Sequence, residues 1–119
     1  MMKLTLINIS YLESVAGGEI SIIREIVEIF KTQVPDFISE MRSLLDKKDF
    51  HNLGLLAHKA KSSIAIMGME ELALMLKEFE ISAREGVNTE KYPLYITRFE
   101  KDTEAAIKEL DNYLKNQLV

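Results

Sequence analysis

Apolar residues recur at three- and four-residue steps along most of the chain, and no segment alternates in the manner of a β-strand. The longest apolar stripe lies between residues 20 and 44 and indicates one long amphipathic helix. Its period resumes in phase after Pro35, so we expect a kink at that residue rather than the end of the helix. The stripe comprises Ile20, Ile23, Val27, Phe30, Val34, Phe37, Met41 and Leu44.

Capping signals predict a short helix before this one and another helix after it. Ser10 and Glu13 have the spacing of a capping box, in which each side chain satisfies a free amide at the start of a helix. We expect that short helix to stop at the glycine pair 17–18. Asp49 is placed to cap the helix that follows the long one, over residues 50–67.

Glycines mark the ends of the last helices. Gly68 closes the helix over 50–67, and the next helix is expected from Met69 to Arg84, ending at Gly86. Thr89 is predicted to cap the last helix, whose first turn tolerates Pro93. Its predicted inner face comprises Tyr92, Tyr95, Phe99, Thr103, Ala106, Leu110 and Tyr113. Short loops favour antiparallel neighbours, so the predicted fold is all-α: an antiparallel up-down four-helix bundle with a short extra N-terminal helix, in a single domain over residues 1–119.

Composition narrows the class of protein without identifying it. The chain has no cysteine, so neither disulfides nor thiolate metal sites hold it together, and a reducing cytoplasm suits it. A net charge of -4 argues against nucleic acid as the main partner, because binding to phosphate backbones needs a basic surface. The sequence contains neither a signal peptide nor a membrane-spanning run, so we expect a cytoplasmic protein.

The predicted helix over residues 50–67 carries an unusual outer face. Its core stripe comprises Leu53, Leu56, Ala57, Ala60, Ile64 and Met67. His58 points roughly 150° away from the centre of that stripe and should stand in solvent. Small and apolar side chains, rather than Glu and Lys, surround it on the outer face: His51, Gly54, Leu55, Ser62, Ala65 and Ile66. Exposed apolar groups gathered in one place indicate a surface that docks a partner.

Charges around His58 point to a phosphoryl group. No Asp or Glu occurs between Phe50 and Met69, and Lys59 and Lys61 supply the only fixed charges. The predicted local field is therefore positive, which favours an anionic group on the imidazole. Lys61 lies three residues from His58 on the helix surface, and Ser62, one turn on, is within reach of the ring or of phosphoryl oxygens. An exposed imidazole is a competent nucleophile.

A metal site is disfavoured by spacing. His51 and His58 are seven residues apart, or two turns, whereas two ligands on one helix chelate a metal at a separation of three or four. No carboxylate lies close by in sequence.

The segment Leu53–Gly68 resembles the signature of histidine-containing phosphotransfer (HPt) domains, Ala-His-x-Leu-Lys-Gly with a further Gly ten residues after the His. Ala57, His58, Lys61 and Gly68 match in type and spacing. Elsewhere the long helix ending near Asp49 fits the family, as do Leu72, Leu76 and the pair Phe79-Glu80, which stands where Leu-Glu is common. Two positions depart from the pattern: Ala60 replaces Leu and Ser62 replaces Gly, which affects packing and the contacts made during transfer.

The resemblance implies that His58 is the phosphoacceptor, that Lys61 helps to hold the phosphoryl group and that Gly68 is structural. The implied partner is a response-regulator receiver domain or a hybrid histidine kinase; a receiver would supply the aspartate and a bound Mg²⁺, so the chain itself needs no cofactor or metal. Partner contacts are expected at His51, Gly54, Leu55, Lys59, Ala65 and Ile66. No nucleotide-binding glycine loop occurs, so we expect a phosphoryl carrier rather than a kinase or other enzyme. The initial Met and the lack of a linker favour a free-standing protein, expected to be monomeric.

Three alternatives remain at this point. The first alternative to an HPt protein is a helical adaptor that docks a partner through the Leu55–Ile66 ridge without phosphoryl chemistry. A metal-assisted hydrolase is the second alternative, although it lacks an acid-base pair beside His58 in the sequence. The third is the phosphoacceptor domain of a chemotaxis-type kinase.

Overall fold

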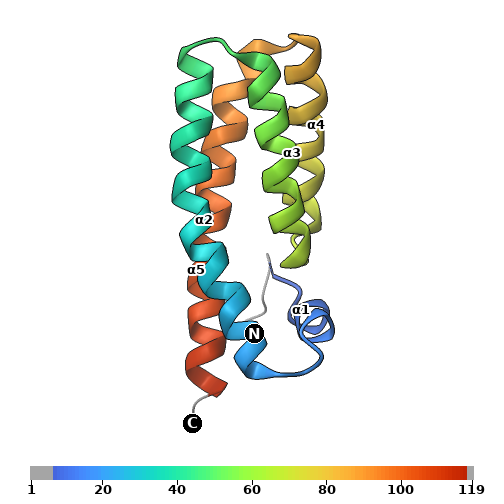
Figure 1. The fold of residues 1–119 in the computed structure, drawn as a ribbon, viewed down its shortest axis with the longest axis vertical. Helices are drawn as coiled ribbons and strands as arrows, with labels where there is room; N and C mark the ends of the chain where they lie inside the picture. The colour runs from blue at the N-terminus through green and yellow to red at the C-terminus, as the bar shows by residue number, and fades with distance from the viewer. Residues whose placement is uncertain (1–6, 118–119) are drawn as a thin grey trace.

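A computed structural model describes residues 7–117, which form α-helices with one short 3-10 segment and no strand within that range. Four long helices pack side by side into a bundle (Figure 1), as the periodicity predicts. The elements in order are α1 (Ile9–Val15), α2 (Ile20–Asp46), α3 (Phe50–Ile66), α4 (Glu70–Glu85), the 3-10 turn η1 (Thr89–Lys91) and α5 (Tyr92–Gln117).

The position of the short helix α1 follows from the unequal lengths of the four long helices. Helices α2 and α5 have 27 and 26 residues, against 17 in α3 and 16 in α4, so one end of the long pair extends beyond the short pair. Helix α1 lies below the α3–α4 pair at that end (Figure 1). Leu12 of α1 and the flanking Ile7 and Ala16 are buried in the common core, so α1 covers apolar surface that would otherwise face water.

The apolar stripes predicted from the sequence form most of the core. In α2 the residues from Ile23 to Met41 on the stripe are buried, and Pro35 lies inside the helix without ending it. In α5 the predicted Tyr95 and Tyr113 are only partly buried, and Ile96 and Leu114 are buried instead. None of the helices within residues 7–117 has an apolar stretch that could cross a membrane.

Two predicted helix caps are wrong. The cap of α1 is Asn8, whose Oδ1 accepts a hydrogen bond from the Tyr11 amide at 3.0 Å, whereas Ser10 lies inside the helix. An asparagine side chain reaches the free amide of the first turn as well as serine does, so the sequence alone does not choose between them. Thr89 begins η1 rather than capping α5, and α5 begins directly after that turn at Tyr92. Asp49 caps α3 as predicted and accepts from the Asn52 amide at 3.3 Å.

Gly68 connects the main bundle to α1. Its φ of +71° is in the left-handed region, where residues with a side chain are strained. A Cβ atom at this position would lie 2.5 Å from Cβ of Asn8, and the Asn8 amide donates to the Met67 carbonyl at 3.2 Å. The turn between α3 and α4 therefore packs against the residue that caps α1, which fits the structural role expected of Gly68.

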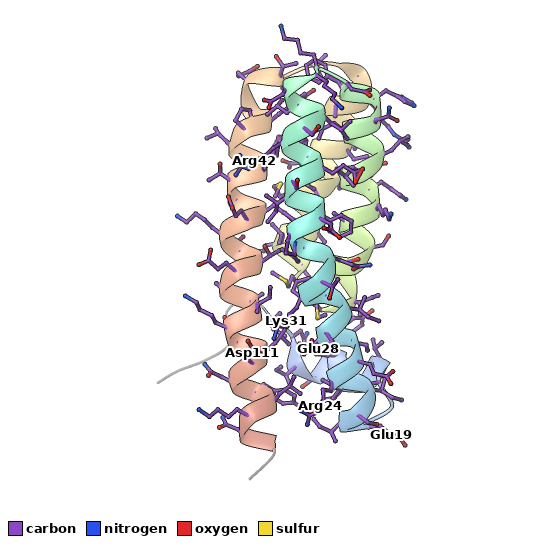
Figure 2. The ribbon with its side chains drawn as sticks, turned by 60° about the vertical axis from the view of Figure 1, so that its left-hand side comes forward. Glu19, Arg24, Glu28, Lys31, Arg42 and Asp111 are labelled. Carbon is purple, nitrogen blue, oxygen red and sulfur yellow. The ribbon has the colours of Figure 1, made fainter. Side chains whose placement is uncertain are left out.

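Ion pairs join α2 to α5 along the exposed side of the bundle (Figure 2). Lys31 Nζ lies 3.1 Å from Asp111 Oδ1, and Arg42 Nη2 lies 2.7 Å from Glu100 Oε1. Such exposed pairs contribute about 1 kcal/mol or less each. The buried apolar stripes therefore hold the two helices together, and the pairs sit at their margin.

Candidate functional site

His58 projects from α3 on the side opposite the core. Its side chain is 56 % exposed, whereas every residue of the predicted core stripe of this helix is buried. The helical-wheel prediction is thus confirmed for the core stripe and for the exposure of His58. The imidazole is accessible to a partner while its helix is anchored by the buried stripe.

A carboxylate from the neighbouring helix contacts the ring. Glu80 of α4 places Oε1 3.1 Å from Nδ1 of His58, and Glu80 is buried, with 8 % of its surface exposed. The purely positive setting predicted for His58 is therefore wrong, because α4 brings an acid to a stretch of α3 that has none. The sequence offered one signal for it, the Phe79-Glu80 pair that fits the HPt pattern.

Two cations share the Glu80 carboxylate with His58. Lys61 Nζ lies 3.9 Å from Oε1, the same oxygen that contacts the imidazole. Arg84, one turn after Glu80 on α4, places Nε 3.7 Å from the other oxygen, Oε2. Both distances are ion-pair contacts that are too long for hydrogen bonds. Lys61 thus lies beside His58 as predicted, and Arg84 is a site residue that the α3 pattern does not reveal.

This geometry decides which nitrogen of His58 is free. An ionised carboxylate has no proton to give and can only accept a hydrogen bond, so Nδ1 is the nitrogen that donates to Glu80. In the neutral imidazole the other nitrogen, Nε2, then holds an unshared electron pair.

The sequence profile of the Hpt domain matches residues 25–116. The chain belongs to the Hpt family. It is therefore a phosphotransfer protein of two-component phosphorelays, and Hpt domains are phosphoryl carriers that interact with receiver domains and kinases rather than catalytic enzymes.

A solved structure shows the same fold. The histidine-containing phosphotransfer protein B (HptB) of Pseudomonas aeruginosa PAO1 is similar with a TM-score of 0.86 over 96 % of this chain and 98 % of that chain. The two sequences are 20 % identical, so this similarity concerns the fold. No curated protein sequence matches the chain.

One residue expected on the docking surface of this Hpt domain lies elsewhere. Gly54 is buried between α3 and α4, and the prediction that it is exposed is wrong. A Cβ atom there would lie 3.0 Å from Arg84 Cγ and 3.1 Å from the Glu80 carbonyl oxygen. The missing side chain therefore lets the backbone of α4 approach α3 one turn before His58.

The remaining expected contact residues are on the exposed face of α3. Leu55 and Ile66 are 41 % and 42 % exposed, and His51, Lys59, Ser62 and Ala65 are exposed as well. Leu55 and Lys59 line a shallow groove between α2 and α3, whose other lining residues are Glu40, Leu44, Asn52 and Leu56. The face around His58 is thus partly apolar and hollowed on the α2 side.

Neither serine after Lys61 is hydrogen-bonded to the imidazole in the described part of the chain. Within residues 7–117 no hydrogen bond joins the Ser62 hydroxyl to the ring, and Ser63 donates instead to Gln33 Oε1 at 2.9 Å. Ser62 remains exposed one turn after His58. Across the same stretch no three His, Cys, Asp or Glu side chains gather in a group that could hold a metal ion.

Proposed function

We propose that His58 is the phosphoacceptor of this Hpt domain and that it exchanges a phosphoryl group with an aspartate of a response-regulator receiver domain. The observation that carries the proposal is an imidazole that is 56 % exposed and has Nδ1 3.1 Å from a buried carboxylate, so that Nε2 is left without a hydrogen bond within residues 7–117. The other histidine, His51, is exposed but does not occupy the motif position, since no lysine follows it three residues later.

The transfer step needs only the electron pair on Nε2. Nε2 attacks phosphorus, an N–P bond forms, and the P–O bond to the partner's aspartate breaks with its electron pair returning to the carboxylate oxygen. The imidazole thereby becomes a cation that keeps its proton on Nδ1. No proton has to leave during the step, and the reverse reaction returns the electron pair to Nε2.

Glu80 supports this step electrostatically. A carboxylate 3.1 Å from Nδ1 orients the ring and stabilises the positive charge that the ring gains when Nε2 bonds to phosphorus. Because Glu80 is buried, little water screens this contact. Lys61, whose side chain is 28 % exposed beside the same oxygen, is the residue we propose to neutralise the phosphoryl oxygens. We also propose that Ser62, exposed one turn after His58, donates a further hydrogen bond to them.

The partner completes the site. We propose that a receiver domain docks on the face formed by His51, Leu55, Lys59, Ala65 and Ile66, and that it carries the Mg²⁺ and the carboxylate. A phosphorylated receiver domain, on its own or within a hybrid histidine kinase, is then sufficient as donor. We expect the chain to act as one domain, as a monomer and in the cytoplasm.

The experiment compares three proteins: the wild type, His58→Gln and the matched control His51→Gln, which removes the other exposed histidine of the same helix. Each is incubated with a phosphorylated receiver domain and with the small phosphodonor phosphoramidate, and acid-labile label on the protein is mapped. We expect label in the wild type and in His51→Gln but none in His58→Gln, with unchanged circular dichroism. Label retained by His58→Gln, or a wild type that takes up none from either donor, would leave the helical adaptor as the better reading.

A further inference from the structure

Arg84 is a second cation at the site that the transfer step described so far does not use. Its guanidinium approaches Glu80 on Oε2, the oxygen that neither His58 nor Lys61 contacts. The Arg84 side chain is 49 % exposed, whereas the carboxylate beside it is 10 % exposed. The guanidinium is thus at the solvent side of the buried acid, on the same side of the molecule as the imidazole.

The absence of a side chain at Gly54 leaves room for the Arg84 side chain to cross α3. The Cγ atom of Arg84 lies 3.0 Å from the point where a Cβ of Gly54 would be, so the aliphatic stem passes over α3 at that residue. Gly54 and His58 are four residues apart and therefore adjacent on one helix face. Crossing α3 at this place brings the end of the side chain beside the turn that carries His58.

We propose that Arg84 joins Lys61 as a ligand of the phosphoryl group on phosphorylated His58, leaving Glu80 to the ring. This inference rests on the proposed function, because it concerns the phosphorylated state of the same histidine. Arg84 changes its partner between the two states of the site. It pairs with Glu80 while His58 is unphosphorylated, and it binds the phosphoryl oxygens once His58 is phosphorylated.

The charges of the site require such a second cation. Without a phosphoryl group, Lys61 and Arg84 face one carboxylate, so the cluster has one positive charge in excess. A phosphoryl group adds about -1.5 to -2 charges at neutral pH, while the ring that carries it becomes a cation. With the cationic ring, Lys61 and Glu80 counted together, about -0.5 to -1 charge remains uncompensated without Arg84. Arg84 supplies the missing charge without any new residue entering the site.

The observed distances allow the exchange. The contact between Arg84 Nε and Glu80 Oε2 is 3.7 Å and forms no hydrogen bond, so Arg84 gives up a long contact when it leaves Glu80, and the carboxylate keeps its contact with the ring. The planar guanidinium presents parallel N–H groups that match two phosphoryl oxygens, which an ammonium group cannot do. The bonds gained on the phosphoryl group are therefore stronger than the contact given up.

The test uses the intact chain, phosphoramidate as the probe, and Arg84→Gln, Arg84→Lys and Arg98→Gln. Arg98 is the matched control, since it is also an exposed arginine paired with an acid four residues away, Asp102, but lies on α5. We expect Arg84→Gln to slow the uptake of phosphate by roughly fivefold, Arg84→Lys to recover part of that loss, and Arg98→Gln to behave as the wild type. We also expect the Nε–H signal of Arg84 in NMR spectra to shift when the wild type is phosphorylated.

The proposal requires both the slower uptake of phosphate by Arg84→Gln and the shift of the Arg84 signal on phosphorylation. If Arg84→Gln takes up phosphate at the wild-type rate, or if the Arg84 signal does not respond to phosphorylation, Arg84 only packs against Gly54 and Glu80 and the proposal is overturned. Either failure leaves the proposed function intact as long as the wild type is labelled on His58. A wild type without label on His58 overturns both.

Discussion

Oε1 of Glu80 lies 3.1 Å from Nδ1 of His58 although the two residues are 22 positions apart and belong to different helices. The contact is possible because α4 packs closely on α3 at Gly54, one turn before the histidine. The imidazole and the carboxylate that contacts it thus come from two helices whose separation is set by a residue without a side chain.

Replacing Glu80 by Gln should slow phosphorylation of His58. The amide oxygen still accepts from Nδ1–H, but its neutral hydrogen bond stabilises the cationic ring less than a carboxylate does. The substitution also removes the repulsion between Glu80 and the phosphoryl group. Because that group binds to Nε2, farther from Glu80 than Nδ1, the lost contact with Nδ1 has the larger effect. We expect initial uptake from phosphoramidate to fall about fivefold to tenfold, or about 1 to 1.4 kcal/mol in activation free energy. The control is Glu78→Gln, an exposed acid of the same helix; equal rates in all three proteins would contradict the prediction.

The sequence predicts the helices, the exposure of His58 and the position of Lys61 near it, because these features depend on periodicity within one helix. The core stripe of α3 follows from its 3.6-residue period, and every member is buried. Gly54 was misplaced because its position on the helical wheel is outward from the core, and whether a neighbouring helix covers an outward residue depends on packing between helices. The position of Arg84 beside the site does not follow from the sequence for the same reason, since the crossing of α4 over α3 is a property of tertiary structure. Ser10 is predicted as the cap of α1 because it forms the capping-box pattern with Glu13, but an asparagine two residues earlier serves the same purpose.

Replacing Gly68 by Ala should destabilise the protein more than the same change at Gly86. Both glycines have similar left-handed φ values, +71° and +67°, so the backbone strain of an L-residue, about 1–2 kcal/mol, is common to both variants. Only at Gly68 does the new Cβ meet another atom, Cβ of Asn8 at 2.5 Å, while nothing lies within 4 Å at Gly86. We expect an additional loss of about 1 kcal/mol or more in the free energy of unfolding of the Gly68 variant, measured with urea. Equal losses in the free energy of unfolding of the two variants would show that α1 moves away from the new Cβ at no cost, which contradicts the prediction.

The cap of α1 can be checked by a pair of alanine variants. Asn8→Ala removes the acceptor of the Tyr11 amide but keeps the Cβ that packs on Gly68, and should cost about 1 kcal/mol in the free energy of unfolding. Ser10→Ala changes an exposed residue inside the helix and should cost less than about 0.5 kcal/mol. If Ser10→Ala lowers the free energy of unfolding more than Asn8→Ala does, in thermal or urea unfolding, Ser10 rather than Asn8 caps this helix.

Tyr113 should make the stability of the protein sensitive to alkaline pH. Burial of the phenol, together with its hydrogen bond to Glu13 at 2.7 Å, raises the pKa of Tyr113 from 10.0 to about 12. Because the folded-state pKa is the higher one, the contribution of Tyr113 is fully present below pH 10 and is lost as the pH rises from 10 towards 12. The measurement is the difference in unfolding free energy between the wild type and Tyr113→Phe as a function of pH. Tyr92 also has a raised pKa because of burial, but it is present in both proteins and cancels. A difference that stays constant across this range would contradict the assignment.

The close approach of α4 at Gly54 separates recognition from reactivity. On the proposed function, a partner that docks on α3 meets mainly the exposed face around His58, while Glu80 and Arg84 of the neighbouring helix α4 set the reactivity of the ring and the charge around it. Substitutions on α4 can therefore retune how fast phosphate moves while the contact surface on α3 stays the same. Two Hpt domains with an identical α3 segment can for this reason differ in transfer rate, and the segment that identifies the family is a poor guide to its kinetics.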